Sequence, residues 1–379
     1  MLAEADKSER DCSLFPVPCS LRMAFVMEQQ AGMRTQYQNW RRVVEQEEGI
    51  AATWIPITYW DDNGLLEKLK FVPGSIRSLL RSRQQTRDGL GSVKYDAILF
   101  NTHNPAVTYQ KPVRTQRTFL MFDVTPKQYD GLVHWYGFGQ KADKPGLYAN
   151  WKHAQVCQTF QAAEGLFAWS NWARQSAIDD YGADPAKVHL VPPGVDTSLW
   201  HPNAAQKPND GVTRILFTGG NFERKGGDLL LKWARETQRK NWELHLVTID
   251  KIEDIPAGVI VHNNVGSNAV ELIRLAQQCD IFALPTRADC FSIASLEAMA
   301  AGLPVIVTNI GGISDIVREG ETGHLIAAEN YEMLGAKLES LMDAPETCRQ
   351  MGQRGREVVC ERFELADTVR SGLKLMAGR

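Results

Sequence analysis

The sequence predicts an α/β protein of two domains, each with a parallel sheet covered by helices on both faces. Short apolar runs typical of strands alternate with stretches of helical spacing along most of the 379 residues. The alternation stops at Trp200–Gly211, where Pro, Asn and Gly are frequent, and then starts again. A chain of this length is also long enough for two domains of ordinary size.

The first domain is expected over residues 21–202, after a polar leader of residues 1–20. A helix-like stretch follows its first strand up to Gln46, and Ser75–Arg87 also has helical spacing. Its expected strands are Arg22–Glu28, Thr53–Thr58, Tyr95–Asn101, Thr118–Val124, Leu166–Ser170 and Val188–Val191.

The second domain is expected over residues 212–360, after an interdomain linker of residues 203–211. Its expected strands are Thr213–Thr218, Glu243–Ile249, Val259–His262, Ile281–Pro285, Pro304–Thr308 and a short one near His324–Ile326. Its expected helices are Asp228–Lys240, Ala269–Gln278 and Ser292–Ala301, and residues 361–379 are expected to form a helix that packs back on the first domain. Because ligands of open α/β sheets bind outside the C-terminal strand ends, a crevice between the domains is the expected site.

Composition and charge narrow the function. The net charge of −3 argues against a general nucleic-acid binder, which needs a basic excess to neutralise phosphates. Seven scattered cysteines without a C-x-x-C pair fit reduced thiols better than a disulfide framework or a zinc site. The chain has no apolar run of about 18 residues and no apolar signal-peptide core, so a cytoplasmic protein is expected.

The segment Thr286–Gly312 reads TRADCFSIASLEAMAAGLPVIVTNIGG and carries the most specific pattern in the chain. It follows an apolar strand and opens a helix, with Ser292 as the expected N-cap and Gly302 as the stop signal. The free backbone N–H groups of Phe291, Ser292 and Ile293, together with the helix dipole, would suit a diphosphate.

Two acids flank this helix start. Asp289 lies in the preceding loop and Glu297 in the second turn, where side chains lean toward the N-terminus. Both could reach one ligand and accept hydrogen bonds from a vicinal diol. By spacing alone, a capped helix with two solvated acids is the alternative.

A second glycine-rich loop lies at Thr218–Asp228, with the sequence TGGNFERKGGD between a strand and a helix. Glycines such as Gly220 allow close approach of the backbone to a phosphate, and Arg224 and Lys225 add positive charge. The pattern is neither G-x-G-x-x-G nor a P-loop, which disfavours dehydrogenases and NTPases. An ordinary strand–turn–helix with exposed basic residues is the alternative.

The two segments together resemble glycosyltransferase family 4 (group 1), in which E-x7-E is followed by A-M-A-x-G-x-P and a later G-G. Here the string is EAMAAGLPVIVTNIGGISDIV. The resemblance implies a GT-B fold, two Rossmann-like domains facing each other across a crevice, and sugar transfer with retained configuration. It also implies that Glu297 binds the nucleotide ribose. Asp289, where the family usually has Glu, would contact the transferred sugar as a catalytic residue.

The family commonly carries G-R-x-x-x-x-K-G in the first of these loops, with both cations on the donor diphosphate. Lys225-Gly226 matches the K-G of this pattern. Gly220 stands at the usual Arg position, and Arg224 is the expected substitute for that cation.

The first domain matches the family only in part. Gly32 follows the first strand, where the family has a glycine-rich loop near the donor phosphates, and a helix-start glycine is the alternative. The family usually places a His near the reacting sugar, and Asp123 stands there as a catalytic candidate or a turn-forming Asp. His103, Asn171 and Arg174 are further candidates for the acceptor side, where packing roles explain them equally well.

A basic stretch precedes these residues. Between Lys68 and Arg87 there is no acidic residue, and Ile76, Leu79 and Leu80 form an apolar stripe at helical spacing. Its six basic residues are Lys68, Lys70, Arg77, Arg81, Arg83 and Arg87. Such a helix can lie peripherally on an anionic membrane, or it can be a solvated domain face.

The sequence therefore predicts a glycosyltransferase that moves a sugar from a nucleoside diphosphate sugar to a hydroxyl of a glycan, a lipid or a small molecule. A UDP-sugar is favoured, with a GDP-sugar as the alternative. No D-x-D or H-E-x-x-H occurs, so neither a metal nor a cofactor is expected. A sugar-nucleotide epimerase of the same fold and a non-catalytic sugar-nucleotide-binding protein remain as other functions.

Overall fold

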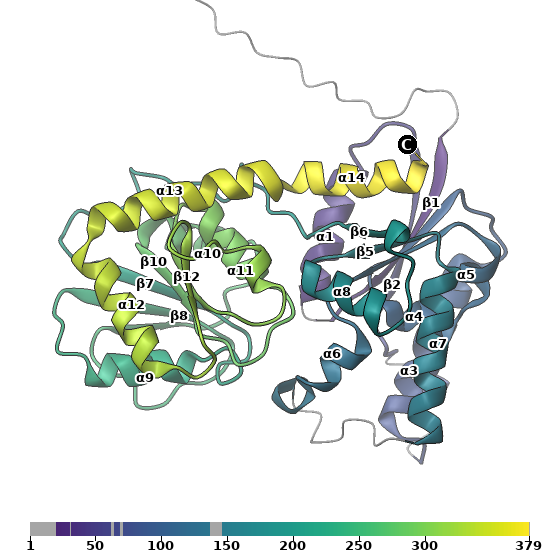
Figure 1. Ribbon diagram of the computed structural model, residues 1–379, viewed down its shortest axis with the longest axis horizontal. Coiled ribbons are helices and arrows are strands. Elements are labelled where there is room, and N and C mark those ends of the chain that lie inside the picture. Colours follow the sequence, from purple (N-terminus) through teal and green to yellow (C-terminus); the bar gives the residue numbers. More distant parts are fainter. Residues whose placement is uncertain (1–19, 31, 62–63, 69–70, 137–145, 379) are drawn as a thin grey trace, which may run out of the picture. The chain divides into compact units, whose positions relative to one another are not determined.

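The computed structural model describes residues 20–30, 32–61, 64–68, 71–136 and 146–378, and it contains two parallel six-stranded sheets with helices packed on them (Figure 1). The predicted α/β fold is thereby confirmed. The polar leader of residues 1–20 lies outside the described residues except for Ser20. Among the described residues, no helix is long and apolar enough to cross a bilayer.

The first sheet has the strand order β2-β1-β3-β4-β5-β6. Pro56 lies in β2, an edge strand, where a residue that lacks the N–H donor is tolerated. The strands are β1 (Leu21–Glu28), β2 (Ile50–Ile57), β3 (Ala97–Phe100), β4 (Thr118–Phe122), β5 (Gly165–Ala168) and β6 (Val188–Leu190). The associated helices are α1 (Gly32–Val44), α2 (Leu65–Lys68), α3 (Gly74–Leu90), α4 (His103–Thr108), α5 (Lys111–Thr115), α6 (Pro126–Asp130), α7 (Leu147–Ala162) and α8 (Asn171–Asp179), with short 3₁₀ turns at Val133–Tyr136 and Pro185–Lys187.

The second sheet has the order β12-β11-β10-β7-β8-β9. Its central strands are apolar and buried, as expected for a parallel sheet covered on both faces. The strands are β7 (Thr213–Thr218), β8 (Trp242–Val247), β9 (Val259–His262), β10 (Ile281–Leu284), β11 (Val305–Thr308) and β12 (Gly323–Ile326). The helices are α9 (Gly227–Glu236), α10 (Val270–Gln278), α11 (Ile293–Ala300), α12 (Tyr331–Asp343) and α13 (Pro345–Arg362), with a 3₁₀ turn at Ile313–Asp315. A further helix, α14 (Leu365–Ala377), contributes its residues from Val369 on to the compact unit that contains β1 to β3.

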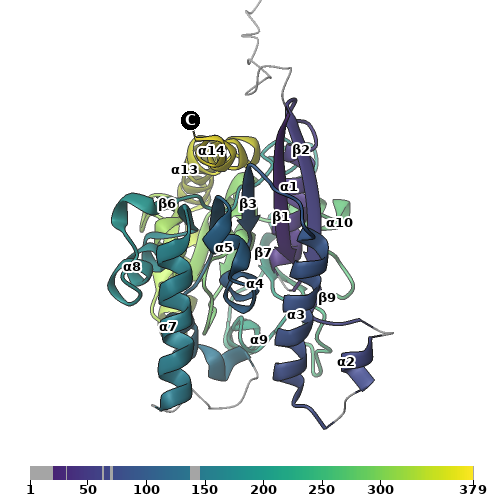
Figure 2. The ribbon, with the colours of Figure 1, turned by 90° about the vertical axis from the view of Figure 1, so that its right-hand side faces the viewer.

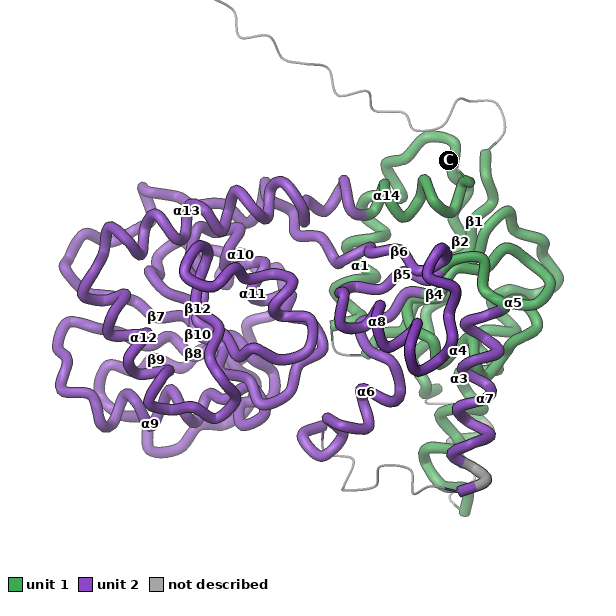
Figure 3. Tube along the Cα trace, in the orientation of Figure 1, with its two compact units in different colours: residues 1–120, 162–165, 369–379 green, residues 121–161, 166–368 purple. Residues whose placement is uncertain are grey.

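The contacts divide the chain into two compact units, coloured separately in Figure 3. The first holds the described residues of Met1–Leu120, Ala162–Gly165 and Val369–Arg379. The second holds those of Met121–Gln161 and Leu166–Thr368. The domain boundaries expected from the sequence differ from this division and stay predictions.

Strand order fixes where a ligand is expected in each sheet. In the second sheet the chain runs from β7 outward to β9 and then crosses to β10 on the other side of β7. In the first it runs from β1 to β2 and then crosses to β3. The loops that follow β7 and β10, and those that follow β1 and β3, therefore flank the two topological switch points, where doubly wound sheets bind ligands.

Sequence reasoning missed several elements between the predicted strands. Helices α4, α5, α6 and α7 were not expected, because the first three are short. In α7 the apolar residues form no single stripe, since Trp151 is exposed while Val156 and Phe160 are buried.

The structure also corrects which residues of the basic stretch are exposed. Helix α3 packs against β2 in the first unit (Figure 2), and Arg81 on it is only 4% exposed. Arg81 is therefore not part of an exposed basic face. Arg77 and Gln85, which lie four residues from it on α3, are half-buried. Lys70 lies outside the described residues.

Candidate functional site

Three loops of the second unit form the site, and they follow the adjacent strands β7, β10 and β11. The first is the glycine-rich loop of residues 219–226, the second is the loop of residues 285–292, and the third contains Gly311 and Gly312. The first two flank the switch point of the second sheet. The two sequence motifs, separated by some 60 residues along the chain, thus meet at one place.

The first two loops touch through their backbones. Gly226 has a φ of 76°, and a Cβ on it would lie 2.0 Å from the carbonyl oxygen of Pro285. The backbone N–H of Arg287 donates to the carbonyl of Arg224 at 2.8 Å. Only glycine allows both this backbone conformation and this approach, which explains why a glycine follows Lys225 in this loop.

Arg287 reinforces this junction, and sequence reasoning missed it. Its side chain is 9% exposed and forms a forked contact with both carboxylate oxygens of Asp228 at 2.6 and 2.8 Å. It also donates to the carbonyl of Glu223 and to Glu329 Oε1. These acceptors raise the pKa of the guanidinium. The only signal in the sequence was its position two residues before Asp289.

Lys225 and Asp289 form the central charge pair. Lys225 Nζ lies 2.5 Å from Asp289 Oδ2, and the two side chains are 15% and 9% exposed. Both residues were predicted site residues, one from each motif. Their pairing at low exposure is a strong charge-assisted contact and leaves the remaining ammonium protons of Lys225 for another acceptor.

Arg224 lies beside this pair. Its Nη1 donates to the carbonyl of Ala288 at 2.7 Å, and its guanidinium lies 4.5 Å from the centre of the Tyr136 ring. The guanidinium is thereby fixed at the junction of the two loops. Its position agrees with the expected second cation of the site, and its role toward a ligand stays a prediction.

The start of α11 is capped as the sequence predicts. The Ser292 hydroxyl accepts from the backbone N–H of Ser295 at 3.2 Å. Phe291 and Ser292 are buried, and Ile293 begins the helix. Glu297 lies on the second turn, is partly exposed, and burial of its carboxyl raises its pKa to about 8. At neutral pH its carboxyl is therefore mainly protonated.

The third loop contacts the backbone of Asp289. A Cβ on Gly311 would lie 2.3 Å from the carbonyl oxygen of Asp289, so the two backbones are in contact. The backbone N–H of Gly312 donates to the carbonyl of Cys290 at 2.9 Å. The G-G of the sequence motif thus holds the loop that carries the acid.

Asp123 belongs to the same electrostatic neighbourhood. Burial, followed by the charges of Asp123 and Asp289, raises the pKa of the Cys290 thiol. The Tyr136 hydroxyl lies 3.7 Å from Cys290 Sγ, and its pKa is also raised, mainly by burial. Asp123, which directly follows β4, therefore acts electrostatically on Cys290, and its role toward a ligand stays a prediction.

The other predicted residues are placed differently. The backbone N–H of Asn171 donates to the Asp315 carboxylate, and Arg174 Nε donates to the carbonyl of Val188 at 3.4 Å, so both have structural contacts. Gly32 begins α1 and His103 begins α4 in the first unit, each after a strand that flanks the switch point of the first sheet. The roles of Gly32 and His103 toward a donor or an acceptor stay predictions.

The part of the chain that carries this site matches a known family. Residues 202–358 match the model described as glycosyl transferases group 1. This segment is therefore similar to the group 1 glycosyltransferases. The resemblance predicted from the sequence is thereby confirmed.

Several proteins similar to this chain are named as glycosyltransferases or mannosyltransferases. The chain is 29% identical over 208 residues to an MMP alpha-(1->4)-mannosyltransferase of Mycolicibacterium hassiacum, covering 52% of this chain and 50% of that protein. It is 29% identical over 195 residues to a D-inositol 3-phosphate glycosyltransferase of Segniliparus rotundus, covering 46% and 43%. The chain thus spans half or less of the length of these relatives.

Solved structures share the whole fold. Sucrose-phosphate synthase from Thermosynechococcus elongatus superposes with a TM-score of 0.74 at 16% identity, over 94% of this chain and 98% of that one. Anabaena HepE in complex with UDP-glucose superposes with a TM-score of 0.68 at 13% identity, over 95% and 100%. At this level of identity the likeness confirms the GT-B fold class and no more.

An added methyl group should change the stability of the protein strongly at one glycine of the first loop and hardly at another. We expect Gly226→Ala to destabilise the protein by more than about 2 kcal/mol, because its Cβ would meet the Pro285 carbonyl at a positive φ. Gly220→Ala should change stability by less than about 0.5 kcal/mol, because nothing lies within 4 Å of its Cβ. Urea unfolding of both variants measures this. Equal losses would contradict the described contact of the two loops.

The raised pKa of Glu297 should make stability depend on pH. The unfolded chain loses this proton near pH 4.5 and the folded chain near pH 8, so the folded state loses stability as the pH rises through this window. Glu297→Gln stays neutral and should gain stability relative to the unchanged protein between pH 6 and 9. Urea unfolding at pH 6 and at pH 9 measures the difference in unfolding free energy between Glu297→Gln and the unchanged protein. A difference that is independent of pH would show that Glu297 is not desolvated.

Proposed function

We propose that this protein is a glycosyltransferase that moves a sugar from a nucleoside diphosphate sugar to a hydroxyl acceptor, with the configuration of the anomeric carbon retained. The observation that carries the proposal is the meeting of Lys225, Arg224 and Asp289 with the start of α11 at one switch point. The match of residues 202–358 to group 1 glycosyltransferases supports it independently.

The donor would lie across the three loops of the second unit. Lys225, Arg224 and the N-terminus of α11 provide positive charge for the diphosphate, and this charge grows in importance as the leaving group departs. Glu297 on the second turn would hydrogen-bond the ribose hydroxyls. Asp289, paired with Lys225, would hold the transferred sugar and keep the cation close to the bond that breaks.

The reaction exchanges one bond at the anomeric carbon for another. The bond to the phosphate oxygen breaks, a bond to the acceptor oxygen forms on the same face, and the acceptor hydroxyl loses its proton. Asp123, whose charge acts on Cys290, is the candidate that would orient or deprotonate this hydroxyl. A UDP-sugar is the first donor to test, since Anabaena HepE holds UDP-glucose, and GDP-sugars come second.

Removal of one donor contact should lower turnover strongly while the fold survives. We expect Lys225→Ala and Glu297→Ala each to reduce kcat/KM by roughly 30- to 1,000-fold, which corresponds to the loss of about 2–4 kcal/mol of transition-state stabilisation. The assay follows sugar transfer from a panel of UDP-, GDP- and ADP-sugars, with Lys251→Ala as the control, because the Lys251 side chain is 86% exposed and pairs with Glu253.

Three outcomes of this assay would contradict the proposal. Near-normal transfer by either variant would show that the substituted residue does not contact the donor in the transition state. A product found only as an altered free sugar nucleotide would indicate an epimerase. Donor binding without any turnover would indicate a non-catalytic binding protein.

We also propose a peripheral membrane contact through α2 and α3 of the first unit. Phe71 is 83% exposed, and Ile76, Leu79 and Leu80 on α3 are between 41% and 47% exposed. The exposed cations beside them are Lys68, Arg83 and Arg87. An exposed apolar stripe with basic neighbours suits the interface of an anionic bilayer, at about 1 kcal/mol per cation near the surface.

A flotation assay tests this contact. We expect the protein to float with vesicles that contain phosphatidylglycerol and to stay unbound with pure phosphatidylcholine. Leu80→Asp combined with Arg83→Glu should reduce the bound fraction at least about tenfold, while Lys251→Glu should not. Equal flotation of both variants would contradict a contact through this helix.

A further inference from the structure

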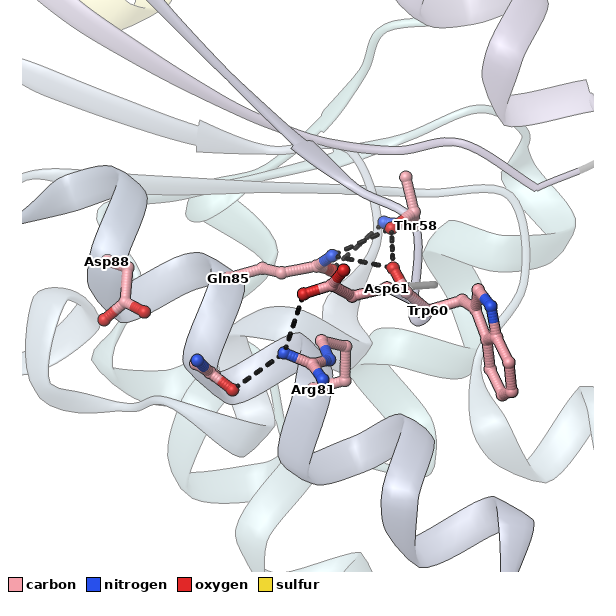
Figure 4. A pocket seen from close by; sticks show the side chains of 7 residues that line it. Thr58, Trp60, Asp61, Arg81, Gln85 and Asp88 are labelled. Atoms are coloured by element: carbon pink, nitrogen blue, oxygen red, sulfur yellow. Dashed lines mark hydrogen bonds and ion pairs between the residues drawn. The ribbon is translucent and has the colours of Figure 1, made fainter. Parts of the chain in front are cut away.

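The first unit holds a pocket of about 610 Å³, and all its lining residues belong to that unit. It lies between the segment that follows β2 and the inner face of α3 (Figure 4). Its lining consists of Thr58, Trp60, Asp61, Arg81, Gln84, Gln85 and Asp88. The four residues from α3 recur at the three- and four-residue spacing of one helix face, which adjoins the apolar stripe of Ile76, Leu79 and Leu80.

A hydrogen-bond network fixes the wall of this pocket. Gln85 accepts from the backbone N–H groups of Thr58 and Tyr59 at 3.1 and 3.3 Å, and its amide donates to the Thr58 hydroxyl at 2.8 Å. Tyr59 has a φ of 61°, and its hydroxyl donates to Glu28 Oε2 at 2.7 Å. The turn is thereby held in a costly conformation, and Trp60 is 52% exposed at the pocket rim.

A buried arginine forms the base of the pocket. Arg81 is 4% exposed, its Nη1 donates to Gln84 Oε1 at 3.0 Å, and it lies 3.5 Å from Asp61 Oδ2. The Asp61 side chain is half exposed. At the other end, Asp88 is paired with Arg87 at 2.9 Å. The fixed guanidinium fork and the carboxylate therefore present directed donors and acceptors side by side.

The chemistry of this lining favours a neutral polyhydroxylated ligand. Arg81 lies against Asp61, and Asp88 is paired with Arg87, so the charges at this lining are balanced and do not favour an anionic group. Amide and carboxylate groups that point into the pocket suit pairs of hydroxyls, whereas a half-exposed indole offers a flat apolar surface for the C–H face of a pyranose ring.

We propose that this pocket binds a neutral saccharide, with the Trp60 ring against the apolar face of a pyranose and Asp61 and Arg81 on its hydroxyls. Gln85 acts as a positioning residue, because it holds the turn that carries Trp60. The inference rests on the proposed function in one respect: the saccharide would be the hydroxyl acceptor of the transfer.

Saccharide binding to the full chain tests the proposal without any turnover. Saturation-transfer difference NMR would use methyl α-D-glucopyranoside and methyl α-D-mannopyranoside, each compared with the corresponding hexose 6-phosphate. We expect the neutral glycosides to bind. Trp60→Ala and Asp61→Asn should weaken this binding at least about tenfold. The matched control is Trp151→Ala, which removes a tryptophan that is 57% exposed on α7.

Each other outcome overturns the proposal. It fails if neither glycoside binds, if only the phosphorylated sugars bind, or if Trp60→Ala binds as well as the unchanged protein. It also fails if the Trp151→Ala control loses binding to the same degree. Thermal stabilisation by UDP-glucose, measured on the same samples, reports the donor site separately. Loss of the proposed function would therefore appear as absent donor stabilisation, while the saccharide result would stand by itself.

Discussion

The ion pair between Lys225 and Asp289 is the interaction on which the proposed donor site depends. It joins the loop after β7 to the loop after β10, and the contact of Gly226 with the Pro285 carbonyl places the two side chains within reach. A low-exposure pair is costly to desolvate, and removal of either partner leaves a charge uncompensated. That cost is justified where a cation must be held ready for an anionic leaving group.

The topology explains why chemically active side chains gather at two places. In the second sheet the switch point lies between β7 and β10, and the residues with cationic and acidic side chains follow these strands. In the first sheet Glu28 is the last residue of β1, and its carboxyl, whose pKa is raised by burial, accepts from Tyr59 and Thr102. By the same rule of strand crossing, a ligand site is expected at the switch point of each sheet.

The sequence predicted the fold class and the family, because strand–helix alternation and the E-x7-E region depend on local spacing. It also located the Ser292 cap, and Gly302 adopts the positive φ expected of a helix stop. Contacts between segments that are distant along the chain could not be predicted from the sequence. Arg287 gave no periodic signal, although it joins both loops, and the burial of Arg81 followed from how α3 packs on β2 rather than from its composition.

The central claim is that Lys225 and Asp289 act as one unit on the donor. A double-mutant cycle tests it most directly, with dissociation constants for UDP-glucose measured for the unchanged protein, Lys225→Met, Asp289→Asn and the double variant. The account predicts a coupling energy of at least about 1 kcal/mol between the two substitutions. Effects that add to within about 0.3 kcal/mol would show that the two side chains contribute independently, and would contradict it.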